Sequence, residues 1–197
     1  MKVNELVQEL VDKKNRWKEF LAAIPADELQ QPGANGEWSA KDLIGHVTFW
    51  DRFEMRQLMA AVDKSSPSKE GLYGERLSSP KWRSVPGEEF QELIVESGRH
   101  MSIEEFAQEW DEIHDRFFPW LKDMPEPMLE EKVGWWLGPP EGTRPDGETR
   151  AWAFESESAL GGGRPVSEWI SAFSGHWREH FEQIERWLNQ SRTTSIT

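Results

Sequence analysis

Two histidines, His176 and His180, stand four residues apart in the segment SGHWREH. This spacing puts both on one face of a helix, with Cβ atoms about 5 to 6 Å apart, so two imidazoles can reach one metal ion. Two half-buried histidines that only line an aromatic-rich helix would give the same pattern, because histidine hydrogen-bonds easily. His46 favours the metal, since it lies between Leu43 and Trp50 on a second apolar stripe, where an unpaired polar ring is costly.

Three inward-facing histidines are typical of a catalytic metal site, in which one coordination position stays open, whereas structural zinc usually has four protein ligands. An ion held in this way lowers the pKa of bound water toward about 7, or holds a thiol as its thiolate. The chain has no cysteine, so any such thiol has to arrive as a cofactor. Disulfides and cysteine-ligated zinc clusters are excluded for the same reason.

Two further residues are catalytic candidates, each with an alternative that stays open. Glu179, next to His180, is either a partner of the ligand or general base, or a charged residue on the solvated face of the helix. His114 is either a fourth ligand or proton shuttle, or a histidine at the edge of the core with a hydrogen-bond partner. His100 precedes a helix cap and receives no role.

Four tryptophans are candidates for the wall of a substrate pocket, although a tryptophan stripe at helical spacing is more often core. Two of them lie in a long loop rich in Gly and Pro, residues 133 to 165, and a loop of this length usually covers or shapes something. The candidates are Trp50, Trp135, Trp136 and Trp177.

The letters HWREH also match H-x-x-E-H, the inverted zinc-protease signature. In that family the third ligand is a glutamate far downstream, but only 17 residues follow His180, and Glu182 and Glu185 are too close in sequence. A short motif without its structural context is weak evidence, so we disfavour the protease.

Four amphipathic helices must position these residues. The apolar spacing predicts a first helix over residues 3–24, stopped by Pro25, and a fourth from Pro165 onward. Capping signals open the second helix at Ser39 and the third at Ser102, and a shorter helix is expected over residues 88–97. No strand pattern is convincing, so the expected fold is all-α, a four-helix bundle with a long crossover between helices two and three. If helices two and four run antiparallel, His46 and His180 lie at similar depths, about 10 and 15 Å from neighbouring helix ends.

Length and charge limit the classes of protein further. A chain of 197 residues fits one domain, which we expect over residues 1–190, with a flexible tail at 191–197. The net charge of −13 argues against nucleic-acid binding, which depends on clustered Lys and Arg. No signal-peptide-like or membrane-spanning apolar run is present, so the expectation is a cytoplasmic protein without a membrane partner.

The segments GEWSAKDLIGHVTFWDRFE and SGHWREHFEQIERWL together resemble the DinB/YfiT-like superfamily of metalloenzymes, and the resemblance extends over essentially the whole chain. The tract PGEEFQELIVESGRHMSIEEFAQEWDEIHDRFFPWL, with RPVSEWISAFSGHWREH, resembles its ClbS/DfsB-type branch. The superfamily resemblance implies an up-down-down-up bundle, often a homodimer, that binds a divalent ion such as Zn²⁺ or Ni²⁺. The implied ligands are His46, His176 and His180. Keeping all three favours the metal-dependent side of the superfamily over the ClbS-type resistance branch.

Two hypotheses of function follow. The first is a metal-dependent transferase or hydrolase that acts by thiol (S-)transfer or hydrolysis on a small electrophilic molecule, as in stress response or detoxification, with a low-molecular-weight thiol as a candidate cofactor. The second is a non-catalytic bundle that binds or sequesters a small molecule, with the histidines as core residues.

Overall fold

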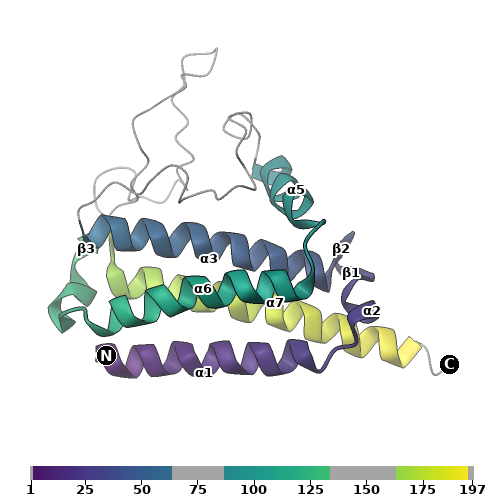
Figure 1. Cartoon of the computed structure of the whole chain (residues 1–197), viewed down its shortest axis with the longest axis horizontal. Helices are drawn as coiled ribbons and strands as arrows, with labels where there is room; N and C mark the ends of the chain where they lie inside the picture. Colours follow the sequence, from purple (N-terminus) through teal and green to yellow (C-terminus); the bar gives the residue numbers. More distant parts are fainter. Residues whose placement is uncertain (1, 64–86, 134–162, 195–197) are drawn as a thin grey trace, which may run out of the picture.

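The computed structural model describes residues 2–63, 87–133 and 163–194 of the chain (Figure 1). Helix dominates these residues, which confirms the predicted all-α class. In chain order the elements are α1 (Val3–Ala22), α2 (Ala26–Leu29), β1 (Pro32–Asn35), β2 (Trp38–Ser39), α3 (Ala40–Val62), α5 (Gly87–Gly98), α6 (Ile103–Lys122), the 3₁₀-helix η3 (Glu126–Glu130), β3 (Lys132–Val133), β4 (Arg164–Pro165) and α7 (Val166–Thr194).

The helix boundaries follow the local sequence signals closely. α1 ends two residues before its predicted end at residue 24, and Pro25 is the N-cap of α2. α3 and α6 begin with complete capping boxes at Ser39 and Ser102, as predicted. α5, over residues 87–98, confirms the short helix expected between the second and third long helices.

The four long helices pack lengthwise, with α1 and α7 running in one direction and α3 and α6 in the other (Figure 1). The contacts between α3 and α7 show their antiparallel arrangement. His46, early in α3, meets His180, whereas Asp51, later in α3, meets Trp177, earlier in α7. The two helices that carry the three candidate ligands are therefore direct neighbours.

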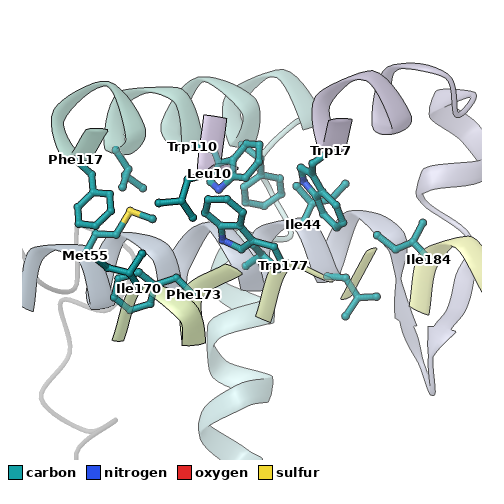
Figure 2. Close-up of a cluster of buried hydrophobic side chains, with 14 of the residues drawn as sticks. Leu10, Trp17, Ile44, Met55, Trp110, Phe117, Ile170, Phe173, Trp177 and Ile184 are labelled. Atoms are coloured by element: carbon teal, nitrogen blue, oxygen red, sulfur yellow. The ribbon is translucent and has the colours of Figure 1, made fainter. Parts of the chain in front are cut away.

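The core between the long helices combines large aromatic rings with aliphatic and methionine side chains (Figure 2). Trp17 of α1 lies 6.4 Å from Trp110 of α6, and Trp110 lies 5.5 Å from Trp177 of α7, measured between ring centroids. All three are buried, and tilted or edge-to-face ring pairs add about 0.5–1.5 kcal/mol each beyond the area that they bury. These ring contacts thus connect α1, α6 and α7 in the core.

Two small antiparallel pairs correct the expectation that the chain has no strands. β1 pairs with β2 directly before α3, and β3 pairs with β4 directly before α7. These strands are only two to four residues long, too short for an alternating pattern to show in the sequence. The turn between β1 and β2 contains Gly36 at a φ of 61°, a left-handed conformation that glycine adopts without strain.

None of the helices in the described ranges has a stretch both long and apolar enough to cross a membrane.

Candidate metal centre

The β1–β2 hairpin and the cap of α3 fix the position of His46. β2 ends at Ser39, whose Oγ accepts a hydrogen bond from the backbone N–H of Asp42, while Asp42 Oδ2 accepts one from the backbone N–H of Ser39. One turn further on, Gly45 lets α6 approach closely, because a Cβ at this position would lie 2.6 Å from Phe106 Cζ. The first turns of α3, which carry His46, are therefore fixed by the capped hairpin before them and by close packing against α6.

The structure brings the three predicted ligands together. His46 Nε2 lies 3.2 Å from His176 Nε2, and His176 Nε2 lies 2.9 Å from His180 Nε2. One ligand atom from each histidine falls within 4.8 Å of the others, and the cluster could hold a metal ion. His46 and His180 are buried, and His176 is half-buried.

Burial keeps the three imidazoles in the neutral form that binds metals. Burial, together with a smaller effect of the charge of His180, lowers the pKa of His176 to about 3. Burial also lowers the pKa of His46 well below its ordinary value, with His176 and His180 adding to the effect. For His180, burial lowers the pKa, against a raising effect from the hydrogen bond to Gln183 and the charge of Glu179. Near neutral pH each ring thus has one nitrogen lone pair free.

The tautomer of His180 follows from its partner. His180 Nδ1 lies 2.7 Å from Oε1 of Gln183, one turn along α7. A carbonyl oxygen can only accept, so Nδ1 carries the proton and the lone pair of Nε2 points at the cluster. In metal sites a ligating histidine commonly donates its other N–H to such an acceptor, which fixes both ring orientation and tautomer.

The other two rings lack such a partner. His46 Nδ1 and His176 Nδ1 are buried, with no hydrogen-bond partner in the part of the chain that the structure describes. If His176 carries its proton on Nδ1, two lone pairs face each other at the 2.9 Å contact with His180 Nε2. If His176 carries its proton on Nε2, that proton can form a well-aligned hydrogen bond with only one of the two neighbouring Nε2 atoms. A cation among the three nitrogens would satisfy all three lone pairs.

Aromatic rings surround His46. Trp38 of β2 lies 5.4 Å from the imidazole and Trp50 of α3 lies 6.4 Å from it, between ring centroids. The Trp38 indole N–H donates to Glu92 Oε1 of α5 at 2.8 Å, which anchors this ring to a separate helix. Aromatic rings in these positions limit the access of water to His46 and strengthen electrostatic interactions near it.

The remaining predicted site residues lie in different environments. Glu179 is exposed on α7. His114 is fully buried in α6 and, among the described residues, does not belong to the histidine cluster. Trp177 is buried, with its indole N–H on Asp51 Oδ1 at 2.7 Å, while Trp135 and Trp136 lie outside the described residues.

Three residues near the site were not singled out from the sequence. Gln183 could have been identified from the sequence, because it stands three residues after His180 and so shares its helix face. Trp38 stands in a strand that the sequence did not predict, and Asp51 resembles an ordinary charged residue of a helix until its burial is known.

Comparisons with known proteins identify a family and a similar fold. The family model described as the DinB superfamily matches residues 9–184. A crystal structure of a protein from Streptococcus pneumoniae superimposes with a TM-score of 0.62 at 13% identity, covering 96% of this chain and 91% of that chain, which is a likeness of fold. No curated protein matches the sequence.

Proposed function

The chain belongs to the DinB superfamily, and from that premise we propose that it is a metal-dependent enzyme whose divalent ion is held by His46, His176 and His180. We propose further that it acts by thiol transfer or hydrolysis on a small electrophilic molecule. The same family resemblance leads us to propose a homodimer, and we propose that it works in the cytoplasm in stress response or detoxification.

The observation that carries the proposal is the distance from His176 Nε2 to the Nε2 atoms of His46 and His180. Two nitrogen ligands about 2.0–2.1 Å from one ion are about 3.3 Å apart at a tetrahedral angle and about 2.9 Å apart at a right angle. The separations of 3.2 Å and 2.9 Å fall on these values. An Nε2–H···Nε2 hydrogen bond has the same length, but a single proton on Nε2 of His176 can form a good hydrogen bond with only one of its two neighbours, so it explains one of these contacts and not both. Imidazole ligands suit Zn²⁺ and Ni²⁺ well, and these are the ions that we propose.

Three ligands from the protein leave room for a fourth group. When bound, such an ion supplies Lewis-acid activation of a water molecule or of a thiol. Gln183 orients His180 through its hydrogen bond to Nδ1, and the rings of Trp38 and Trp50 pack beside His46. We propose Trp50, with the loop pair Trp135 and Trp136, as the wall on which an electrophilic substrate rests. A thiol for S-transfer has to be a small cofactor, since the chain has no cysteine.

Metal binding tests the proposal directly. Zn²⁺, Ni²⁺ and Co²⁺ are titrated into metal-free protein, and metal content is measured after dialysis. We expect one equivalent bound in the low-micromolar range or tighter, and a higher melting temperature with metal, because an ion bound only by the native state stabilises it. His46→Ala and His180→Ala should abolish both effects, whereas the matched control His100→Ala should change neither.

Wild-type protein that binds no ion at these concentrations would refute the metal proposal and favour the non-catalytic binding bundle. If metal binds but small electrophiles react no faster with glutathione, bacillithiol, mycothiol or water, the site stands and the proposed reaction is wrong.

A further inference from the structure

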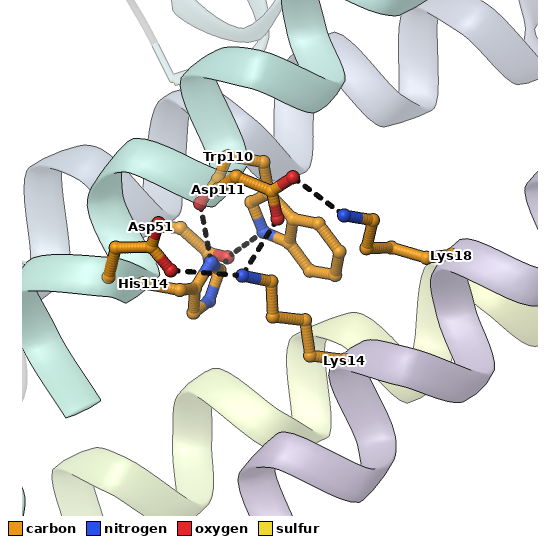
Figure 3. A network of polar contacts seen from close by, with 7 residues as sticks. Lys14, Lys18, Asp51, Trp110, Asp111 and His114 are labelled. Atoms are coloured by element: carbon orange, nitrogen blue, oxygen red, sulfur yellow. Dashed lines mark hydrogen bonds and ion pairs between the residues drawn. The ribbon is translucent and has the colours of Figure 1, made fainter.

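A carboxyl group that is not part of the histidine cluster is completely buried in the middle of the bundle. Asp51 of α3 is 0% exposed. Its Oδ2 accepts the indole N–H of Trp110 from α6 at 2.5 Å, and its Oδ1 accepts the indole N–H of Trp177 from α7 at 2.7 Å. One side chain therefore links three helices, and Figure 3 shows the half of this arrangement that faces α6.

The fourth member of the network is His114. Its Nδ1 lies 2.7 Å from the backbone carbonyl oxygen of Trp110, which can only accept, so Nδ1 carries the proton. Its Nε2 stands 3.5 Å from Asp51 Oδ2, too far for a good hydrogen bond. The two indoles are thus the groups that hold the carboxyl oxygens in place. Burial raises the pKa of Asp51 to about 7, with the two indole hydrogen bonds acting in the opposite direction.

The hydrogen bonds of this network depend on the relative position and orientation of their partners, whereas apolar packing depends on them much less. A polar group buried without partners costs free energy, so any sliding of α3 along α7 that separates Asp51 from Trp177 is penalised. Apolar contacts alone penalise a small slide much less, because the hydrophobic effect depends on buried area rather than on direction. Fixing register is the best-supported role of a buried polar group.

The place of this contact in the two helices connects it to the histidines. Trp177 stands between His176 and His180 in sequence, and Asp51 follows His46 by five residues, about 7.5 Å along the helix axis. Because an α-helix is stiff over one or two turns, the register set at Asp51 and Trp177 is also the register at which the three Nε2 atoms meet. A slip of one turn, about 5.4 Å, would exceed the separation between any two of the ligand atoms.

We propose that Asp51 is a positioning residue for the metal centre, which holds α3 and α7 through Trp177 in the one register that brings His46 to His176 and His180. This inference rests on the proposed function and deepens it.

The two tryptophans provide a matched pair of variants for the test. Trp177→Phe and Trp110→Phe each remove one indole N–H from Asp51 and keep a ring in the core. Only Trp177 lies on a helix that carries ligands, so only its loss should loosen the metal centre. Asp51→Asn serves as a third variant, because an amide retains one acceptor oxygen but opposes the second indole N–H with its own N–H groups.

The readouts are the Co²⁺ dissociation constant and the visible absorption spectrum of bound Co²⁺, which reports ligand geometry, together with urea unfolding of the metal-free proteins. We expect Trp177→Phe and Asp51→Asn to weaken Co²⁺ binding about tenfold and to change the spectrum, since partners that orient ligands typically contribute 10–100-fold in affinity. Trp110→Phe should lower stability, yet bind Co²⁺ as wild type does with the same spectrum.

The outcomes separate this inference from the proposed function. If wild-type protein binds no Co²⁺, both are refuted. If wild type binds Co²⁺ and all three variants bind it with equal affinity and an unchanged spectrum, the metal centre stands and the positioning role is wrong. Equal losses in Trp177→Phe and Trp110→Phe would also overturn it, because they would show a general effect of core stability.

Discussion

The hydrogen bond from His180 to Gln183 leads to opposite predictions for two substitutions at Gln183, one of which should weaken metal binding and the other tighten it. Its Nδ1–Oε1 distance of 2.7 Å is at the short end of the range for N–H···O hydrogen bonds, so the contact is well formed. Gln183→Ala removes the acceptor, and the ring is then free to rotate and to exchange tautomers. Gln183→Glu replaces the amide oxygen with a carboxylate, which makes a charge-assisted hydrogen bond and raises the basicity of the ligand.

The expected magnitudes follow from the net free energy of one hydrogen bond. A neutral hydrogen bond contributes about 0.5–1.5 kcal/mol and one to a charged group about 1.5–3 kcal/mol. If this difference acts on metal binding, Gln183→Ala weakens the affinity about tenfold, since about 1.4 kcal/mol is a factor of ten. Gln183→Glu tightens the affinity by a factor of several up to about ten on the same scale.

The assay is a competition between the protein and a chromogenic chelator for Zn²⁺ at fixed pH and ionic strength. Unfolding of the metal-free variants in urea corrects for any change in stability, and Gln190→Ala, an exposed position on the same helix, controls for a lost amide. Weaker binding in both Gln183 variants, or binding within twofold of wild type in both, would refute the assigned tautomer and the role of Gln183.

Three further predictions concern the scaffold. Gly45→Ala should destabilise the protein by about 1–3 kcal/mol in urea unfolding, because its Cβ would lie 2.6 Å from buried Phe106 Cζ, and adding Phe106→Leu should recover part of the loss. Ser39→Ala should cost about 1 kcal/mol by removing the cap of α3, whereas Ser39→Asp should restore most of it. Burial lowers the pKa of His114 to about 3, so the stability that it contributes is present above pH 6.5 and is lost as the pH falls toward 3. Between pH 7 and 5, wild type should therefore lose about 2 kcal/mol more than His114→Asn, and a difference independent of pH would contradict this.

Local signals in the sequence were sufficient to predict the helices and the three histidines that the structure brings together. His46, His176 and His180 each fall on an apolar stripe, and a histidine in such a position needs a polar partner or a metal. The capping boxes at Ser39 and Ser102 are short-range patterns that involve no tertiary contact, and both were predicted correctly.

The position of Asp51 could not be predicted in this way. An acidic residue in a helix is normally exposed, and the partners that bury this one are separated from it by 59 and 126 residues along the chain. Trp177 was one of four candidates for a pocket wall, with a core position as the more usual alternative, and the same contact places its indole N–H on a carboxyl inside the bundle. Short strands next to α3 and α7 escaped prediction because they depend on a pairing of only a few residues.

Most of this bundle satisfies the ordinary rules of burial, with caps on its helices and large apolar rings in its core. Several buried polar groups on α3 depart from those rules, and two of them contact α7: His46, whose Nε2 meets the Nε2 of His176, and Asp51, a carboxyl group without exposure. Both departures are directed at α7, and they lie within two turns of each other along α3. Local conflicts with folding rules are expected where function requires them. Our two proposals therefore meet at the contact between α3 and α7, where we assign metal binding to the histidines and alignment of the helices to the buried carboxyl.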